Sequence, residues 1–534
     1  MVASLANERG RSTTIGEPVM PIEISSPSRR DLVRAAAGMA TFAVAGVSSQ
    51  AIGQSALPRK GGALTIGVVS DPVTLDPAFF SSFFEIYAQY LMHEPLLSIT
   101  PDLVIEPGLA SYEMKDELTY VFALRPGLTF HDGSPFDAKA AKWNFERMLD
   151  PKTGSPRRSD LGPVDAVEVM GERGFSVRFK RPFAPFPHAL TNRAGLFASP
   201  AAVERLGADF ATRAVGAGPF RVVSWTKNAE LVLERFDGYW REGMPYLDRV
   251  TLRPMPDETV RLANLRSGTV NLVDSVPPQN FRTLQRERGL KTAEKGGVGF
   301  NAFSLNLTRA PFDDKRVRQA LMCALDMEAV QRAAYFNTGQ PAYGAISPPL
   351  RSTFDPNFKP YTRDPSRAKA LLAETGKPAP SFEITVINSP VVIRIAEIIQ
   401  AQAAEAGFKV AIRQIDGTSL ISVLRGKEFD LCYSPWAGRS DPDGNMFNWF
   451  TIDGPNNFMG YRNEKVDQAL KEARSAAVPG ARPALYREAE RLIADDAPML
   501  FVHFDAALQC GTDELHWTQH PDGSFRLFDA WLTA

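Results

Sequence analysis

The sequence predicts an α/β protein built from more than one domain. Strands and helices alternate as strand, helix, strand, short helix and strand at residues 382–388, 391–406, 408–415, 419–424 and 429–433. Short connections between such elements imply right-handed crossovers and a largely parallel sheet. The chain has 534 residues, 44% of them hydrophobic, which is enough for the cores of two or three domains.

Two further strands are expected on either side of this alternating block. Residues 298–307 alternate between apolar and polar side chains, which is typical of a half-buried strand. Residues 500–507 are predicted to form another strand, after helices at 466–473 and 482–494. Ahead of the block, a helix is predicted to begin at Asp364, because an aspartate cap followed by proline favours a helix start. One strand therefore leads into the block and another leads out of it.

The N-terminal half contains its own set of predicted strands. They include residues 61–69, residues 119–124, and a hairpin made of 220–225 and 231–235. Residues 176–189 are rich in proline and are predicted to be an extended connection. These elements indicate a separate folded region that precedes the alternating block in the sequence.

A loop is predicted at the exit of the last strand of the block, from residue 434 to Gly444. Its Asp-Pro and Asp-Gly pairs break strands and form turns. In open α/β sheets, ligands bind beyond the C-terminal ends of the strands. The position of this loop therefore makes it the first candidate for a binding site.

The loop combines an aromatic ring, a cation and two carboxylates, from Trp436, Arg439, Asp441 and Asp443. One interpretation is a ligand-binding loop. The other is a surface turn in which Arg439 pairs with Asp441 or Asp443, because structural ion pairs are common. A second aromatic group, Phe79, Phe80 and Phe83, could line a cleft or belong to the core.

Residues 1–55 are predicted to be an export signal. A polar leader ends at Arg29-Arg30, and an apolar run at residues 35–47 is followed by small polar residues. The run is too short to cross a bilayer, which takes about 20 residues. The arginine pair resembles a twin-arginine signal, although a plain export signal could carry such a pair by chance. We therefore expect an exported, soluble chain.

The composition excludes several classes of protein. A net charge of −1 gives no basic excess for nucleic acid. Cys323, Cys432 and Cys510 lie too far apart in the sequence to suggest a disulfide framework or a zinc site. The sequence has no P-loop, no GxGxxG after a strand and no GxSxG. We expect no metal and no cofactor.

Several segments, in this order along the chain, resemble the family 5 extracellular solute-binding proteins of ABC importers. That family binds oligopeptides, dipeptides, nickel chelates, opines and some sugars. The matching segments are GGALTIGVVSDPVTLDP, LRPGLTFHDGSPFDAKAAKWNFERM, GAGPFRVVSWTKNAELVLERFDGYWREGMPYLDRV, PDETVRLANLRSGTVNLV, APFDDKRVRQALMCALDMEAV, GQPAYGAISPP, DPSRAKALLAETG and FDLCYSPWAGRSDPDGN. Single segments are weak indications, but the ordered set spans nearly the whole mature chain.

The resemblance implies a two-lobe periplasmic-binding-protein fold of type II, similar to cluster C, with an extra subdomain inserted in lobe one. The export signal would be followed by lobe one at residues 56–300, with the subdomain at about 110–215. Lobe two would span 301–505, and 506–534 would return to lobe one.

The resemblance also bears on Arg439. In peptide-binding members of the family, an aspartate three residues after the matching tryptophan holds the α-amino group of the peptide. Here Arg439 stands at that spacing from Trp436. A cation would repel an ammonium and favour a carboxylate, which a guanidinium can hold with two hydrogen bonds. We therefore expect a ligand with an acidic or neutral polar end. If Arg439 pairs with Asp441 instead, a neighbouring carboxylate could still hold an amine.

The expected ligand contacts combine this loop with two other segments. The phenylalanines and Trp436 would supply apolar surface, while Arg439 and the backbone after residue 299 would supply polar contacts. The full set is Trp436, Arg439, Asp441, Asp443, Phe79, Phe80, Phe83, Phe300, Asn301 and Phe303.

The resemblance implies the periplasmic substrate-binding component of an ABC importer. Such a protein, expected here to be a monomer, captures a peptide-like or other small polar solute by closure of two lobes and delivers it to an inner-membrane permease. Two alternatives remain. One is an exported hydrolase that uses Asp441 and Asp443 as its carboxylate pair, which needs one raised pKa. The other is a binding module that serves a chemoreceptor or acts as a chaperone.

Overall fold

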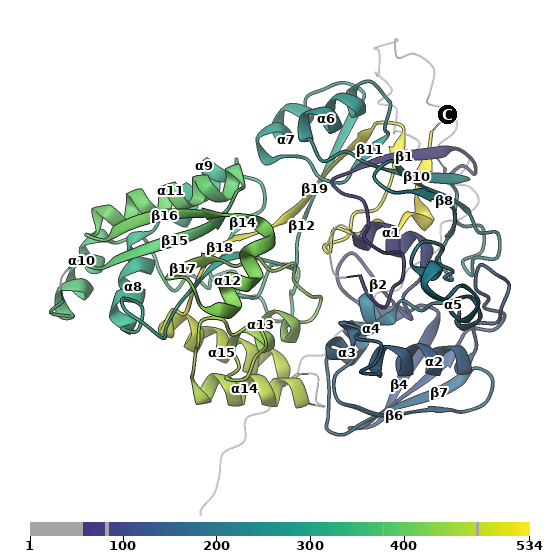
Figure 1. Ribbon diagram of the computed structural model, residues 1–534, viewed down its shortest axis with the longest axis horizontal. Helices are drawn as coiled ribbons and strands as arrows, with labels where there is room; N and C mark the ends of the chain where they lie inside the picture. Colours follow the sequence, from purple (N-terminus) through teal and green to yellow (C-terminus); the bar gives the residue numbers. More distant parts are fainter. Residues whose placement is uncertain (1–56, 81–84, 378, 477–479, 534) are drawn as a thin grey trace, which may run out of the picture. The chain divides into compact units, whose positions relative to one another are not determined.

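The computed structural model describes residues 57–80, 85–377, 379–476 and 480–533. Contacts between residues divide the chain into two units, Met1–Ala56 and Leu57–Ala534. All the elements described lie in the second unit (Figure 1). The predicted export signal lies outside the described residues.

The first large sheet has seven strands and defines lobe one. Strand β1 is parallel to β10 and β11, whereas β19 is antiparallel to β11 and β12. In sheet order the strands are β12 (Leu290–Gly296), β19 (Ala506–Thr512), β11 (Leu272–Val273), β1 (Ala63–Val68), β10 (Arg249–Pro254), β9 (Glu230–Arg235) and β8 (Phe220–Thr226). The predicted hairpin is confirmed as β8 and β9.

A second, four-stranded antiparallel sheet belongs to the same lobe. Its order is β4 (Ala110–Asp116), β5 (Thr119–Leu124), β7 (Gly174–Phe179) and β6 (Val164–Val169). Its core is rich in phenylalanine, and the rings of Phe122 and Phe175 stack with centroids 4.9 Å apart. Two short ladders complete the strands of this lobe: β2 (Leu97–Ile99) with β3 (Ile105–Pro107), and β20 (Leu515–His516) with β21 (Trp531–Leu532).

The third sheet has six strands and defines lobe two. Its order is β14 (Gln340–Pro341), β18 (Met499–Phe504), β13 (Asn301–Leu305), β17 (Leu431–Tyr433), β15 (Ser381–Ile387) and β16 (Lys409–Ile415). The expectation of a largely parallel sheet is only half right. Strand β15 is parallel to β16 and β17, but β13 is antiparallel to both of its neighbours. The reason is that β13 brings the chain into this sheet from lobe one, and β18 leads it back to lobe one. Neither strand is joined to a parallel neighbour by a crossover helix.

Helices cover these sheets in both lobes. In lobe one they are α1 (Glu85–Met92), α2 (Ala138–Leu149), α3 (Arg157–Asp160), α4 (Phe186–Leu190), α5 (Pro200–Leu206), α6 (Glu258–Arg266) and α7 (Pro278–Leu284). In lobe two they are α8 (Lys315–Ala324), α9 (Met327–Ala334), α10 (Pro365–Glu374), α11 (Pro390–Glu405), α12 (Leu420–Gly426), α13 (Pro442–Phe450), α14 (Glu464–Ser475) and α15 (Arg482–Asp496).

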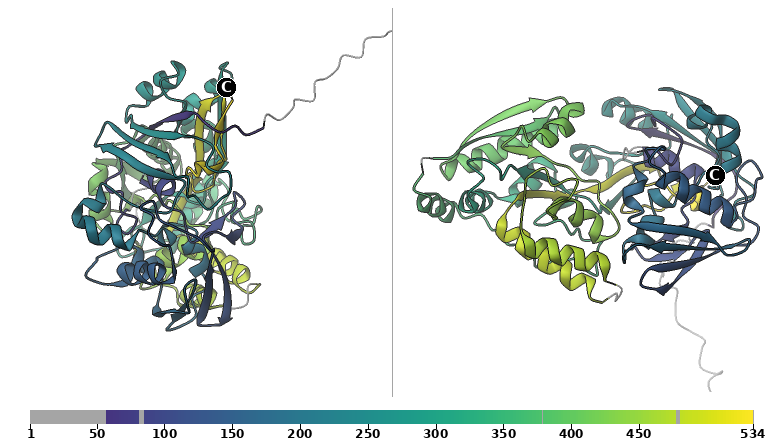
Figure 2. Two further views of the ribbon diagram at one scale, coloured as in Figure 1. Left: turned by 90° about the vertical axis from the view of Figure 1, so that its right-hand side faces the viewer. Right: turned by 60° about the horizontal axis from the view of Figure 1, so that its bottom comes forward.

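Two stretches of chain connect the lobes. One runs from β12 to β13, and the other from β18 to β19, whose yellow ribbon passes from one sheet to the other (Figures 1 and 2). Side chains tie the two stretches together, because Asn301 Nδ2 donates to Asp505 Oδ1 at 2.6 Å. The Tyr433 hydroxyl donates to the other end of the Asn301 amide, at 2.5 Å.

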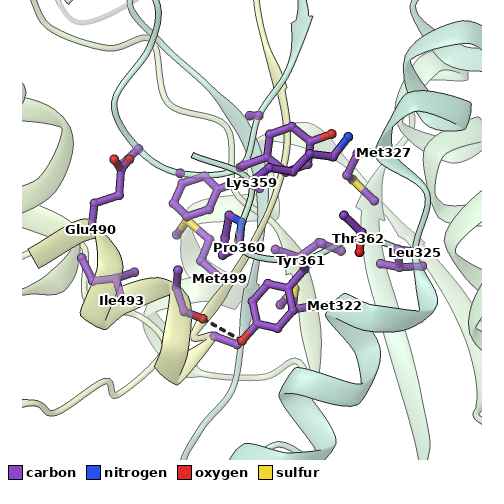
Figure 3. Close-up of a pocket in the computed structure, with 18 of the residues that line it drawn as sticks. Met322, Leu325, Met327, Lys359, Pro360, Tyr361, Thr362, Glu490, Ile493 and Met499 are labelled. Carbon is purple, nitrogen blue, oxygen red and sulfur yellow. Dashed lines mark hydrogen bonds between the residues drawn. The ribbon is translucent and has the colours of Figure 1, made fainter. Parts of the chain in front are cut away.

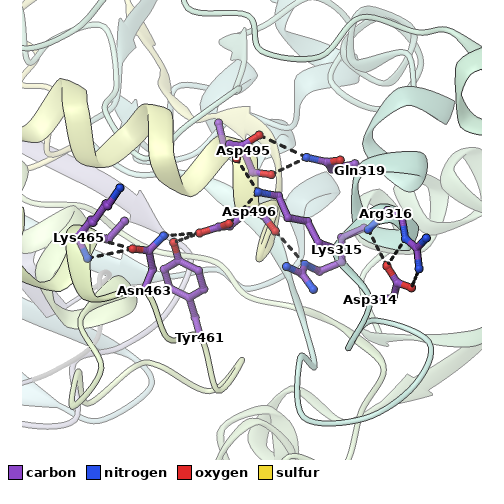
Figure 4. Close-up of polar contacts among 12 residues, drawn as sticks. Asp314, Lys315, Arg316, Gln319, Tyr461, Asn463, Lys465, Asp495 and Asp496 are labelled. Atoms are coloured by element: carbon purple, nitrogen blue, oxygen red, sulfur yellow. Dashed lines mark hydrogen bonds and ion pairs between the residues drawn. The ribbon is translucent and has the colours of Figure 1, made fainter. Parts of the chain in front are cut away.

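A polar network fixes the ends of α8 and α15 in lobe two (Figure 4). Lys315 Nζ contacts Asp495 at 2.5 Å and Asp496 at 3.0 Å. Asp496 also accepts hydrogen bonds from the Tyr461 hydroxyl at 2.7 Å and from Asn463 at 2.6 Å. The C-terminal end of α15 is thereby held in place, which matters because Glu490, Ile493 and Ala494 of this helix line one of the two cavities described below.

Candidate functional site

The predicted loop ends earlier than expected, because helix α13 begins at Pro442. Asp441 is its N-cap, and its side chain accepts a hydrogen bond from the Asp443 backbone N–H at 2.9 Å. The prediction of a loop through Gly444 was therefore wrong. Aspartate followed by proline is also the preferred start of a helix, and here that preference prevails over the Asp-Gly turn.

Trp436 joins the loop to the strand that enters lobe two. Its backbone exchanges two hydrogen bonds with Phe300, each 2.9 Å long. The indole Nε1 donates to Asn445 Oδ1 at 3.0 Å, and the ring packs edge-on against Trp449. Asn445 also accepts from the Arg439 backbone N–H at 2.8 Å. The loop is therefore fixed at both ends, and the half-buried indole ring has a defined position.

Arg439 lies against the ring of Trp436, with its guanidinium carbon 4.8 Å from the ring centroid. One guanidinium nitrogen donates to the Gly438 carbonyl at 2.7 Å. Gly444 makes room for the side chain, since a Cβ there would lie 2.4 Å from Arg439 Cγ. In the part of the chain that the structure describes, no carboxylate lies within 4.0 Å of this guanidinium.

Asp441 and Asp443 are paired with other arginines. Arg482 binds both oxygens of Asp441, at 2.7 and 2.9 Å, and Arg474 binds both oxygens of Asp443, the shorter contact being 2.6 Å. Each aspartate is 3% exposed. The alternative in which Arg439 pairs with one of them is therefore wrong, since both carboxylates are already held by arginines from helices α14 and α15.

The two aspartates differ in their pKa. For Asp441, burial opposes ionisation, but the charge and hydrogen bonds of Arg482 outweigh it, and the pKa is lowered. For Asp443, burial prevails over the attraction of Arg474, and the pKa is raised.

The loop faces residues of lobe one across a cavity of about 270 Å³, called the interlobe gap below. His188 Nδ1 lies 3.3 Å from Ser440 Oγ, and the Ala184 backbone N–H donates to the Arg474 carbonyl at 2.9 Å. The gap is lined by Ser159, Asp160, Phe183, Pro185, His188, Ala189, Asn192, Arg193, Ala194, Arg439, Ser440, Asp441, Asp443, Gly444, Phe447, Asn448, Pro455 and Arg474.

Two more arginines from lobe one lie close to Arg439. Burial, together with the charges of Arg439 and Arg157, lowers the pKa of Arg193 to about 9. Burial likewise lowers the pKa of Arg157, which forms an ion pair with Asp160 at 2.7 Å. Mutual repulsion among these three cations shows that this end of the gap has a positive potential.

The other predicted contact residues are distributed differently. Phe300 and Phe303 are fully buried in the core of lobe two, where neighbouring strands occupy their backbone groups. Phe80 is also a core residue, at 1% exposed, whereas Phe79 is 40% exposed. Asn301 holds Asp505 and does not line the gap. Phe83 lies outside the described residues.

His188, Arg193, Phe447 and Arg474 line the gap but were not predicted from the sequence. His188 lies near the end of the proline-rich stretch, residues 176–189, that was expected to be an extended connection, and Arg193 follows it. The end of that stretch instead forms the short helix α4, Phe186–Leu190, which turns His188 toward Ser440. The order in which proline precedes a first helical turn was the available indication.

Residues 104–458 match the family described as bacterial extracellular solute-binding proteins, family 5, middle region. The chain belongs to this family. The family resemblance seen in the sequence is therefore confirmed, and this family 5 protein is the substrate-binding component of an ABC importer.

Curated relatives and solved structures agree with this assignment. The glutathione-binding protein GsiB of Pectobacterium atrosepticum is 29% identical over 505 residues, covering 92% of this chain and 97% of the relative. The substrate-binding protein CtaP of Listeria monocytogenes has 26% identity and a TM-score of 0.82, covering 89% of this chain and all of CtaP. DppA of Helicobacter pylori, solved with the peptide STSA, has 23% identity and a TM-score of 0.77, covering 89% and 99%.

The structural neighbours confirm the predicted fold class, a type II periplasmic-binding-protein fold. Across the described part of this family 5 protein, none of the helices combines the length and the apolar character needed to cross a bilayer.

Proposed function

We propose that this family 5 protein captures an acidic, peptide-like solute in the interlobe gap, with Arg439 holding a carboxylate of the ligand. One observation carries the proposal: among the described residues Arg439 has no carboxylate partner, although it lies in a cavity beside two aspartates. Because both aspartates are already bound by arginines, the charge of Arg439 is left to be compensated from outside the protein.

The balance of charge around the gap supports an anionic ligand. Three arginines at or next to the gap are paired with three carboxylates: Arg157 with Asp160, Arg474 with Asp443 and Arg482 with Asp441. Arg439 adds a fourth positive charge, which none of these carboxylates compensates. Burial lowers the pKa of His188, so its imidazole adds no positive charge near neutral pH. A ligand carboxylate placed at Arg439 would neutralise this excess charge.

The geometry of Arg439 suits a carboxylate in particular. Its guanidinium rests on the Trp436 ring, which fixes the plane of its donors. A planar donor fork can then bind both oxygens of a carboxylate at a small cost in side-chain entropy. Phe447 lines the gap and offers apolar surface there, whereas Trp436 supports the guanidinium but does not line the gap.

Glutathione is the first ligand to test. It carries two carboxylates and one amine on a peptide-like backbone, and the relatives that cover this chain almost completely are named for binding it. A second carboxylate of such a ligand would be attracted toward Arg193 and Arg157 in lobe one. A ligand held by both lobes favours their closed arrangement by its differential affinity, and the permease would receive it from that state.

We further propose that the protein acts in the periplasm as a monomer, exported by the signal at residues 1–55. The proposed domain limits are those expected from the sequence: lobe one at 56–300, its subdomain at about 110–215, lobe two at 301–505, and a return at 506–534. Membership of strands in the three sheets supports these limits.

We propose that the ligand leaves the gap chemically unchanged. A hydrolase would need Asp441 and Asp443 as an acid and a base, but both are held by bidentate arginines. Mass spectrometry of a ligand incubated with the protein tests this point, since recovery of cleaved ligand would favour the enzyme. The non-transport binding module has no observation in its favour, whereas the family match favours transport.

The proposal is tested by replacing Arg439 with alanine and measuring glutathione binding by calorimetry. The expected result is a loss of affinity of at least about tenfold, and Arg439→Lys should recover only part of it because an ammonium cannot form the planar fork. Arg425→Ala, an exposed arginine of α12 in the same lobe, is the matched control. Unchanged affinity in Arg439→Ala would overturn the proposal.

A further inference from the structure

A second cavity lies entirely within lobe two (Figure 3). Its volume is about 100 Å³, and it shares no lining residue with the interlobe gap. Strand β18 and helices α8 and α15 form its walls, and residues 359–363 cross it as an extended segment. It is called the lobe-two cavity below.

The walls of the lobe-two cavity are mostly apolar. Met322, Met327, Met446 and Met499 all contribute to them, and each is at most 8% exposed. Figure 3 shows the thioethers of three of these residues around Pro360 and Tyr361. Methionine side chains are flexible and polarisable, so such a wall can adapt to small ligands of different shape.

Glu490 is the exception among these walls. It extends from α15, is 4% exposed, and its Oε1 accepts a hydrogen bond from the Ile346 backbone N–H at 3.1 Å. The chain approaches it closely at Gly344, where a Cβ would lie 2.2 Å from that oxygen. Among the described residues, no lysine, arginine or histidine lies within 4.0 Å of the carboxyl group. Burial accordingly raises the pKa of Glu490 to about 8.

The other charged residues of the lining do have partners of opposite charge. These pairs are Asp326 with Arg332 at 3.7 Å, Glu328 with Lys359 at 3.4 Å, and Arg363 with Glu405. Glu490 is therefore distinguished from them by its burial and by its missing cation. A buried acid of this kind is costly unless a partner is supplied.

We propose that the lobe-two cavity is a second ligand site, which takes a small apolar primary amine whose ammonium group is held by Glu490. An engineered cavity of about 150 Å³ accommodates benzene, so the smaller space here suits an alkyl chain of about four carbons. The chain would lie among the methionines, and the ammonium would supply the cation that the protein omits.

The proton balance of this binding step is defined. An amine that enters as an ammonium ion displaces the proton of Glu490 to solvent and leaves an ammonium–carboxylate pair. An amine that enters neutral takes that proton from Glu490 and gives the same pair. An alcohol of equal length gains no charge, and a carboxylate would place two acids together, so the amine is favoured over both.

The probe is n-butylamine, with n-butanol as the neutral comparison, titrated by calorimetry at pH 7.5 in two buffers of different ionisation enthalpy. The wild type is expected to bind butylamine, bind butanol more weakly, and release a proton with the amine. Glu490→Gln, which resembles the neutral acid in shape, should lose butylamine affinity by at least about tenfold. The matched control is Glu488→Gln on the same helix, where an exposed carboxylate pairs with Arg491.

Two further variants keep the test decisive. Ala494→Met adds a side chain at the cavity wall and should abolish butylamine binding while Glu490 is kept. Arg439→Ala should leave butylamine binding unchanged, because the interlobe gap is a separate site. The proposal is overturned if the wild type binds no butylamine, if Glu490→Gln binds it as well as the wild type does, or if Arg439→Ala removes the binding.

Discussion

The interlobe gap and the lobe-two cavity each contain one charged group without a partner of opposite sign among the described residues. In the gap it is Arg439, half-buried on Trp436, and in the cavity it is Glu490, 4% exposed. A guanidinium keeps its charge wherever it lies, so only a ligand or solvent can compensate Arg439. A carboxyl group can take up a proton instead, and Glu490 does so through its raised pKa of about 8. The lack of a partner of opposite charge therefore leaves a charged site in the interlobe gap and a neutral one in the lobe-two cavity.

Asp441 gives a third case, a buried charge whose partner, Arg482, is within the protein. Removal of Arg482 is expected to have the largest effect on stability of the variants described below. Arg482→Met should leave the Asp441 carboxylate buried and uncompensated, lowering the free energy of unfolding by about 3–5 kcal/mol. Urea unfolding followed by tryptophan fluorescence measures this.

The control is Arg491→Met, an exposed arginine on the same helix, for which a change of less than about 0.5 kcal/mol is expected. Adding Asp441→Asn to Arg482→Met should recover part of the loss. If the two arginine variants unfold alike, the pair does not compensate Asp441 as the geometry implies.

The neutral state of Glu490 is expected to give a smaller, pH-dependent effect. The pKa of Glu490 is about 8 in the folded protein and 4.5 as a reference for the unfolded chain. The stability contributed by the neutral acid is therefore full below about pH 4.5 and is lost as the pH rises through about 8. Between pH 5 and pH 7 the loss should be on the order of 3 kcal/mol, because one pKa unit corresponds to about 1.4 kcal/mol.

Denaturant unfolding of the wild type and Glu490→Gln over this pH range measures the effect as a difference, in which the other titrating groups cancel. The difference should grow in favour of the glutamine variant as the pH rises. A difference that stays constant with pH would show that Glu490 ionises normally, and the contrast with Arg439 would then fail.

Arg439 depends on Gly444 for its position, which gives a prediction of intermediate size. In Gly444→Ala the new Cβ would lie 2.4 Å from Arg439 Cγ and 2.6 Å from its Cβ, so the side chain must leave the Trp436 ring. Ligand affinity is expected to fall about tenfold, while the gain in helix propensity of about 0.5–1 kcal/mol offsets strain in the fold. Gly417→Ala, where no atom lies within 4 Å of the added Cβ, is the control. Equal ligand affinity in Gly444→Ala and Gly417→Ala would show that the position of Arg439 does not matter for ligand binding.

Helix starts can be predicted from the sequence where apolar residues at helical spacing follow the cap. Asp364 caps α10 as expected, and Asp441 caps α13 by the same Asp-Pro order although a turn was predicted there. Met446, Trp449 and Phe450 follow at helical spacing and are all buried. That helical periodicity indicates a helix, and it outweighs the turn preference of Asp443-Gly444.

The partners of the site could not be predicted from local pattern. His188 meets Ser440 across 252 positions in the sequence, and Arg474 and Arg482 reach the aspartates from helices that follow the loop. Such contacts depend on how two lobes and three helices pack, which periodicity does not specify. Glu490 is an intermediate case, because it shares a helix face with the buried residues Tyr486 and Ile493 and could have been noticed as an acid on an apolar stripe.

Phe79 is expected to give the smallest effect and defines how far the ligand site extends. It is 40% exposed and does not line the interlobe gap, although Arg147 lies 5.5 Å from its ring centroid. Phe79→Ala should therefore change ligand affinity by less than about threefold, which corresponds to under 1 kcal/mol. Phe447→Ala is the comparison, since that ring lines the gap and stacks against Arg474 at 3.1 Å, and it should weaken binding more. A larger loss of affinity in Phe79→Ala than in Phe447→Ala would place the ligand site at the aromatic cluster of lobe one. An exposed ring could contribute more to affinity than a ring in the gap only if it contacts the ligand directly.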